Sequence, residues 1–215
     1  MMTRVEIDPE WSGQLDAGLK ELALPLRDAQ CELLLGYLGL LKKWNRAFNL
    51  TAVRDPGVMV RRQLLDSLSI VPWVDCGPVL DVGTGAGLPG IPLAIASPGL
   101  NFSLLDSNGK KTRFVKQAAG ELGLSNVEVI RSRVEEFDRP GHYARITSRA
   151  FANLADMVSL TGHLLARDGR WLAMKGADRD TERRDLPDGI EVSSVALQVP
   201  GEPGQRHLAV LSRER

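Results

Sequence analysis

The chain has 215 residues, of which 43% are hydrophobic and 25% charged, a composition typical of an ordinary soluble globular protein. This length suits one large α/β domain, or one domain with a small appendage. The 27 basic and 27 acidic residues give a formal net charge of zero, so an anionic partner would have to bind a local basic patch.

The sequence contains no pattern for export, membrane insertion or metal binding. The first residues lack an apolar signal segment, and the leucine-rich run is too short to cross a bilayer, so we expect a cytoplasmic protein without membrane contact. Cys31 and Cys76 have no metal-ligand spacing, and we expect both to be reduced and packed. The three histidines form no recognisable metal cluster, so no metal site is predicted.

Residues 1–75 are predicted to form a small helical unit packed on the rest of the chain. Residues 1–12 show no clear pattern, and Leu15, Leu19 and Leu22 then recur at helical spacing until Pro25 interrupts it. A second helix with a wide apolar face is expected from about Leu26 to Arg46. The turn residues Asp55–Gly57 then indicate a helix start, and a third helix is expected from Val58 to Val71.

Residues 76–215 alternate strand and helix patterns, which predicts an α/β fold with a doubly wound, mainly parallel sheet. The last two strands are separated by a short proline- and glycine-rich loop, so we expect them to form an antiparallel hairpin at the sheet edge. The expected strands are Val79–Val82, Asn101–Leu105, Val127–Ile130, Tyr143–Ser148, Arg170–Lys175, Glu191–Val199 and Arg206–Leu211. The expected helices are Pro89–Ala96, Lys110–Leu122, Val134–Phe137 and Asn153–Leu165.

A glycine-rich turn follows the first of these strands. Strand, glycine turn and helix in succession allow a cofactor to lie against bare backbone. A dinucleotide fingerprint requires Gly-x-Gly-x-x-Gly, whereas this chain has Gly83, Gly85 and Gly87 followed by Leu88. With Asp81 ahead of it, the spacing resembles the first motif of class I S-adenosylmethionine (SAM) methyltransferases. A dinucleotide site and a turn without a ligand remain as alternatives.

Ligands in open α/β sheets bind at the carboxyl ends of the strands, where this chain places several charged residues. Asp106 ends the second strand and suits a ribose diol, although it would also suit a helix cap. Glu135 follows the third strand, where an adenine would be approached. Arg149 ends the fourth strand, nearest to a transferred methyl group, although a surface arginine is the alternative. Asp81 is placed to orient the turn or to meet a cofactor ammonium group.

Several catalytic groups are missing. Exocyclic amine methyltransferases usually have an acid or amide and two prolines at the fourth strand end, where this chain has Arg149-Ala150-Phe151. Neither cysteine lies near a strand end that would suit a nucleophile. A site without base or nucleophile suits an acceptor that already has a free lone pair, such as N7 of guanine, for which alignment is the main requirement.

Basic residues cluster despite the zero net charge. Residues 42–62 contain six lysines and arginines against a single acid, and the helix expected after Asp106 is also basic. Several of these residues are expected around the same sheet edge as the glycine turn, as phosphate binding would require. Solvated helix faces are the alternative explanation.

In combination, these segments make the chain similar to the bacterial small-subunit (16S) ribosomal RNA guanine-N7 methyltransferase family (methyltransferase G), whose older name is glucose-inhibited division protein B. The resemblance extends from about Leu40 to Val210. It rests on Trp44-Asn45, Asn49-Leu50-Thr51, Leu65-Asp66-Ser67-Leu68, the segment from Asp81 to Pro92, Leu104-Leu105-Asp106-Ser107, Ser132-Arg133-Val134-Glu135, Ser148-Arg149-Ala150-Phe151, Lys175-Gly176 and Arg206-His207-Leu208.

The resemblance implies a class I, Rossmann-like methyltransferase that uses SAM to methylate N7 of one guanine, nucleotide 527 in the 530 loop of 16S rRNA. The substrate would be the RNA, the 30S subunit or its assembly intermediate, and we expect a monomer. The resemblance and the glycine motif together predict cofactor contacts at Asp81, Gly83, Gly85, Gly87, Leu88, Asp106, Val134, Glu135 and Arg149, with Arg149 also as the catalytic residue. RNA contacts are expected at Lys110, Lys175, Arg206, His207, Arg46 and Arg62.

One position departs from the family pattern. Gln63 stands where the family usually has histidine, and because glutamine does not titrate, any role of that histidine in RNA contact or packing does not carry over directly. Two other functions remain open, a small-molecule methyltransferase and a non-catalytic ribosome-assembly factor that binds RNA. A nicotinamide oxidoreductase is disfavoured by Leu88 at the third dinucleotide glycine.

Overall fold

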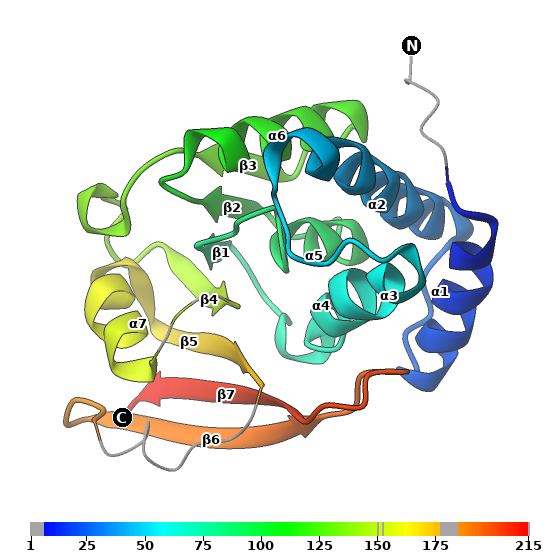
Figure 1. Cartoon of the computed structure of the whole chain (residues 1–215). Coiled ribbons are helices and arrows are strands. Elements are labelled where there is room, and N and C mark those ends of the chain that lie inside the picture. The colour runs from blue at the N-terminus through cyan, green and yellow to red at the C-terminus, as the bar shows by residue number, and fades with distance from the viewer. Residues whose placement is uncertain (1–6, 150, 152, 177–184, 215) are drawn as a thin grey trace.

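The computed structural model describes residues 7–149, 151, 153–176 and 185–214, which form a seven-stranded sheet with helices on both faces (Figure 1). The strand order is β3-β2-β1-β4-β5-β7-β6. The first five strands are parallel, and β7 runs antiparallel to both β5 and β6. The strands are β1 Val79–Val82, β2 Phe102–Leu105, β3 Val127–Ile130, β4 Tyr143–Ser148, β5 Leu165–Lys175, β6 Ile190–Leu197 and β7 Arg206–Arg213. The predicted doubly wound sheet with a terminal antiparallel hairpin is therefore confirmed.

Each face of the sheet has its own hydrophobic cluster, as expected where parallel strands are covered on both sides. One cluster joins the sheet to α5 (Gly90–Ala96), to α6 (Gly109–Glu121) and to the helices of the N-terminal 75 residues. The other joins it to α7 (Leu154–Thr161). The N-terminal helices thus lie on the same side of the sheet as α5 and α6 (Figure 1).

The N-terminal helices contact α5 and the part of the sheet formed by β1 and β2 through side chains of α2 (Asp28–Phe48). Gln30 donates hydrogen bonds to the carbonyls of Ile95 and Ala96 at the end of α5. Residues of α2 also belong to the cluster that contains β1 and β2. The division of the chain at residue 75 stays a prediction, because both parts contribute to this one cluster.

The first helix begins earlier than the sequence indicated. Helix α1 runs from Pro9 to Glu21, although residues 1–12 gave no clear periodicity. Its signal is the pair Asp8-Pro9, in which Asp8 caps the helix by accepting from the Glu10 amide and Pro9 fits the first turn.

The prediction of one continuous helix from Val58 to Val71 is wrong. Short helix α3 (Pro56–Met59) is followed by a π-helical segment, η1 (Val60–Leu65), by α4 (Asp66–Leu68) and by a 3-10 turn, η2 (Val71–Trp73). π-Segments are frequent at functional sites, because the wider turn redirects side chains.

The prediction was also wrong where α7 meets β5. The helix ends at Thr161 rather than Leu165, η4 (Gly162–Leu164) follows, and β5 begins at Leu165 rather than Arg170. The added strand residues extend the pairing with β4, where Leu165 lies opposite Tyr143 across a register shift.

Within the described part of the chain, no helix combines the length and hydropathy needed to span a bilayer.

Candidate active site

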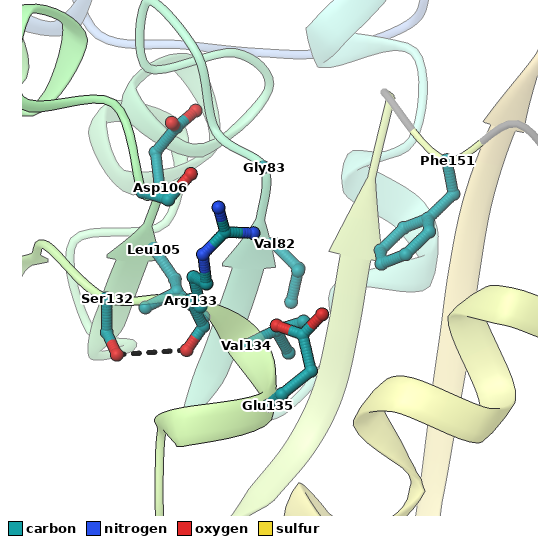
Figure 2. Close-up of a pocket in the computed structure, with 10 residues that line it drawn as sticks. Val82, Gly83, Leu105, Asp106, Ser132, Arg133, Val134, Glu135 and Phe151 are labelled. Carbon is teal, nitrogen blue, oxygen red and sulfur yellow. Dashed lines mark hydrogen bonds between the residues drawn. The ribbon is translucent and has the colours of Figure 1, made fainter.

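A cavity of about 220 Å³ lies at the carboxyl ends of β1 and β2, where ligands of open α/β sheets bind (Figure 2). Figure 2 shows Asp106 at the end of β2 on one side of this first cavity and Phe151 on another. Two residues of the short helical turn η3 (Val134–Glu136), which follows β3 in the chain, also line it. The lining residues are Val82, Gly83, Leu105, Asp106, Ser107, Ser132, Arg133, Val134, Glu135 and Phe151.

Four of the predicted cofactor residues, Gly83, Asp106, Val134 and Glu135, line this cavity. The other glycines shape the turn beside it. Gly85 and Gly87 have φ values of 61° and 92°, a conformation that residues with a Cβ rarely adopt. Leu88 is buried in the core beneath the turn and is not among the cavity-lining residues.

Asp106 connects the glycine turn to the end of β2. One carboxylate oxygen accepts from the Gly85 amide at 2.9 Å, and the other accepts from the Asn108 amide at 2.8 Å. The alternative reading of Asp106 as the cap of the next helix is wrong, since the N-cap of α6 is Asn108. A carboxylate offers about four acceptor positions, so both oxygens retain capacity for a ligand.

Asp81 is fully buried beneath the turn. Its Oδ2 accepts from Thr84 Oγ1 at 2.6 Å and from the Gly90 amide at 2.9 Å, so this side chain fixes the start of α5. Its Oδ1 is buried and has no hydrogen-bond partner within the described structure. Burial raises the pKa of Asp81 to about 7, against the opposing effect of the two hydrogen bonds. A cationic group brought by a ligand would stabilise the ionised carboxylate.

Tyr37 makes a contact with the glycine turn that the sequence did not indicate. Its side chain extends from α2 and donates a hydrogen bond of 2.8 Å to the carbonyl of Ala86 in the glycine turn. Tyr37 is fully buried, and burial raises the pKa of its hydroxyl, so the hydroxyl stays protonated as a donor. The N-terminal helices thereby hold the turn in place.

A second cavity, of about 390 Å³, lies at the ends of β4 and β5 next to η1. It brings together the predicted catalytic residue Arg149 and three predicted RNA-binding residues, Arg62, Lys175 and Arg206. Its lining is completed by Val53, Asp66, Met174 and Gly176.

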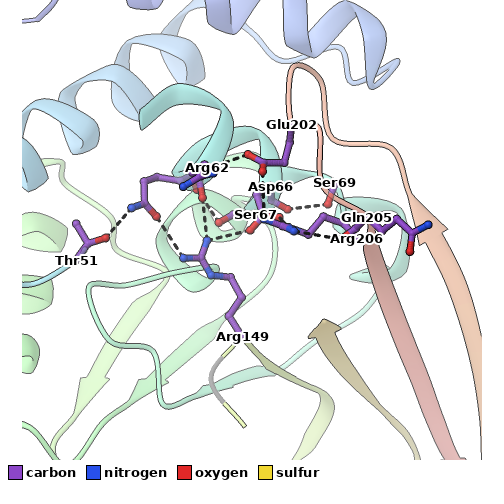
Figure 3. A network of polar contacts seen from close by, with 10 residues as sticks. Thr51, Arg62, Asp66, Ser67, Ser69, Arg149, Glu202, Gln205 and Arg206 are labelled. Carbon is purple, nitrogen blue, oxygen red and sulfur yellow. Dashed lines mark hydrogen bonds and ion pairs between the residues drawn. The ribbon is translucent and has the colours of Figure 1, made fainter. Parts of the chain in front are cut away.

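The guanidinium of Arg149 is directed toward η1 rather than into the first cavity (Figure 3). It donates to Asp66 Oδ2 and to the Arg62 carbonyl, both at 3.1 Å, and to Gln63 Oε1 at 3.3 Å. Gln63 is fully buried and donates in turn to Thr51 Oγ1 at 2.9 Å. Gln63 therefore links the loop after α2 to Arg149, at the position where the family usually has histidine.

Two acids to which the sequence assigned no role, Asp66 and Glu202, hold these cations. Asp66 accepts from Arg206 Nε at 3.2 Å as well as from Arg149, and burial raises its pKa against the effect of both arginines. Glu202, from the β6–β7 loop, pairs with Arg62 at 3.2 Å and with Arg206 at 3.6 Å. An acid inside the apolar run from Leu64 to Leu68 was a signal for Asp66, whereas nothing in the loop sequence indicated Glu202.

Three predicted RNA-binding residues lie outside both cavities. Lys110 is exposed in the first turn of α6, and Arg46 is exposed in the last turn of α2. His207 lies in β7, paired with Lys175 across the sheet. In the described ranges, no group of three histidine, cysteine or acidic side chains could hold a metal ion.

The sequence matches a family model described as "rRNA small subunit methyltransferase G" over residues 30–209. It is 56% identical to the ribosomal RNA small subunit methyltransferase G of Marinobacter nauticus, over 95% of this chain and 96% of that protein. It is 54% identical to the protein of the same name from Stutzerimonas stutzeri, over 93% of this chain and 94% of that one.

Solved structures are similar in fold at low identity. TrmN from Thermus thermophilus matches with a TM-score of 0.58 and 19% identity, over 79% of this chain and 53% of that chain. A SAM-dependent methyltransferase from Aquifex aeolicus matches with a TM-score of 0.54 and 18% identity, over 73% of this chain and 93% of that one. The class I, Rossmann-like fold that the resemblance implied is confirmed.

Proposed function

Because the chain belongs to the rRNA small subunit methyltransferase G family, we propose that it transfers a methyl group from SAM to N7 of one guanine in the 530 loop of 16S rRNA. Membership of the family supports SAM-dependent methylation of rRNA. The choice of N7 as the acceptor atom and of a guanine in the 530 loop as the target is what we propose in addition. The near full-length similarity to relatives of that name is the observation that carries it.

The residues of the first cavity fit SAM. Asp106 has acceptor capacity for the ribose diol, and Val134 and Phe151 offer apolar surface for the adenine. Asp81 lies beneath the turn, outside the lining of this cavity, and the charge of its carboxylate would favour the positive charge of the methionine ammonium. When bound, SAM supplies an electrophilic methyl group on a sulfonium.

The chemistry at N7 requires little from the protein besides alignment. The N7 lone pair lies in the plane of the base and carries no proton, so no general base is needed. Asp66, the acid of the second cavity, is already paired with two arginines and is a poor candidate for proton abstraction. Holding the two reactants in line supplies roughly 7–11 kcal/mol in favourable cases.

The test is transfer of labelled methyl from SAM to 16S rRNA and to 30S particles that lack the modification, with the product mapped by cleavage at 7-methylguanosine. We expect one labelled guanine in the 530 loop. SAM binding without transfer to either RNA substrate would contradict the proposal and favour a small-molecule acceptor. RNA binding without SAM binding would favour an assembly factor instead.

A further inference from the structure

Among the described residues that line the second cavity, Asp66 is the one that carries a carboxylate. Asp66 is only 7% exposed, and each of its oxygens accepts from a different arginine, Arg149 or Arg206 (Figure 3). Because a carboxylate has about four acceptor positions, two remain for a ligand. Buried Met174 and partly buried Val53 supply apolar wall. The cavity therefore combines a flat hydrogen-bond acceptor with surfaces against which a ring could pack.

This cavity shares a wall with the first one. Phe151, in the segment after β4, lines the first cavity, and its carbonyl accepts from Lys175 Nζ at 3.1 Å in the second. Arg149, two residues earlier, lines the second cavity. A base in the second cavity would therefore lie beside the first cavity, with Arg149 on its own side and Phe151 on the side of the cofactor residues. A volume of about 390 Å³ falls in the lower part of the range of small-molecule sites.

Among the four RNA bases, guanine matches this carboxylate best. Its Watson–Crick edge presents two adjacent donors, N1–H and the N2 amino group, which can each donate to one oxygen of a carboxylate. Adenine and cytosine present a donor next to a lone pair, and uracil presents one donor between two carbonyls. The guanine O6 atom lies beside N1–H. Arg149 and Arg206 are bonded to the same carboxylate, so either guanidinium would be placed to donate to O6.

We propose that the second cavity receives the target guanine and that Asp66 reads its Watson–Crick edge, which makes Asp66 a specificity-determining residue; this assignment rests on the proposed function. Enzymes that act on a base extrude it from its stack and read that same edge. This mode of binding leaves N7, on the opposite edge, free to receive the methyl group. The excess of arginine and lysine around Asp66 suits the phosphates, which position the RNA without specifying the base.

The same contact would assist the reaction. As N7 gains the methyl group, the purine becomes cationic, and its N1–H and N2 amino groups become stronger donors. The hydrogen bonds to Asp66 therefore strengthen in the transition state relative to the ground state, and such interactions raise kcat rather than only lowering KM.

The test compares methyl transfer to unmethylated 30S particles whose 16S rRNA carries either guanosine or inosine at the target position. Inosine keeps N7, N1–H and O6 but lacks the N2 amino group. For the wild-type protein we expect kcat/KM on inosine to be lower by roughly 10- to 100-fold, the discrimination typical of a lost specific base contact. Equal rates on the two particles would overturn the assignment without any variant being made.

The variant arm uses Asp66→Asn, with exposed Asp16→Asn on α1 as the matched control. We expect Asp66→Asn to lose kcat on guanosine and to bring the ratio of guanosine to inosine toward one, whereas Asp16→Asn behaves as wild type. Full discrimination retained by Asp66→Asn would assign the selectivity elsewhere. Failure of the wild-type protein to form any 7-methylguanosine is a different result, because it would overturn the proposed function itself.

Discussion

Replacing Asp106 by alanine tests the cofactor site most directly. In the structure its two oxygens accept from the Gly85 and Asn108 amides and retain acceptor capacity toward the first cavity. A hydrogen bond to a charged group contributes roughly 1.5–3 kcal/mol. Two ribose hydroxyls bonded to this carboxylate would therefore contribute about 3 kcal/mol or more. Since each 1.4 kcal/mol is tenfold in affinity, we expect Asp106→Ala to bind S-adenosylhomocysteine roughly 100-fold more weakly.

The assay must separate contact with the ribose from support of the glycine turn, because alanine removes both. Titration calorimetry with S-adenosylhomocysteine and with its analogue lacking both ribose hydroxyls, for wild type and variant, forms a double-mutant cycle. If Asp106 holds the ribose, the wild type discriminates strongly between the two ligands and the variant does not. Equal discrimination by both proteins would refute the ribose contact and leave only the turn. Asp16→Ala, on the outer face of α1, is the control.

The remaining predictions concern the frame of the turn. Tyr37→Phe leaves the buried Ala86 carbonyl without its donor and should lower the free energy of unfolding by roughly 1–2 kcal/mol in urea titrations. Gly90→Ala would place a Cβ 2.7 Å from Asp81 Oδ2 and against Leu104, so thermal unfolding should show a loss of about 1–3 kcal/mol. Because the folded pKa of Asp81, about 7, exceeds its ordinary value, the unfolded state binds fewer protons between about pH 4 and 7, and this group costs stability as the pH rises through that window. Asp81→Asn should therefore lose less stability than wild type between about pH 5 and pH 8, by roughly 2 kcal/mol.

Each of these predictions has a contrary outcome. If the free energy of unfolding of Tyr37→Phe equals that of the wild type, a water molecule must replace the hydroxyl at the Ala86 carbonyl. A fully stable Gly90→Ala protein would mean that Leu104 moves aside without cost. Parallel pH profiles of wild type and Asp81→Asn would place the pKa of Asp81 near its ordinary value.

The central strands were predictable because parallel strands buried on both faces are short apolar runs with abrupt ends. Val79–Val82 and Tyr143–Ser148 have the bounds expected from sequence, and so does the partly buried edge strand Val127–Ile130. The residues of the first cavity were predictable for a related reason, since the carboxyl ends of adjacent parallel strands meet at one edge of the sheet. Asp106 needed only the assignment of β1 and β2 as neighbours, which the structure bears out.

The second cavity was not predictable from local patterns. Arg149 was identified, but its side-chain partners Asp66 and Gln63 are 83 and 86 residues away in the chain, and pairing at that distance leaves no periodic signal. The π-helical segment η1 was missed because one extra residue per turn scarcely alters the apolar spacing of Val60, Leu64 and Leu65. That same turn places Gln63 and Asp66 on the Arg149 side.

The pairing of cations with acids in the second cavity bears on how a chain of zero net charge could select one nucleotide. Arg149 and Arg206 are both bonded to Asp66, so their side chains are ordered before RNA arrives and lose little conformational freedom on binding. The same pairing reduces the positive potential available for binding phosphates of any sequence. An enzyme built in this way gains little from charge alone, and its selectivity must come from the shape of the RNA and from contacts to the base. We therefore expect the decisive interaction at Asp66, the buried carboxylate among the described lining residues, rather than at the lysine and arginine side chains around it.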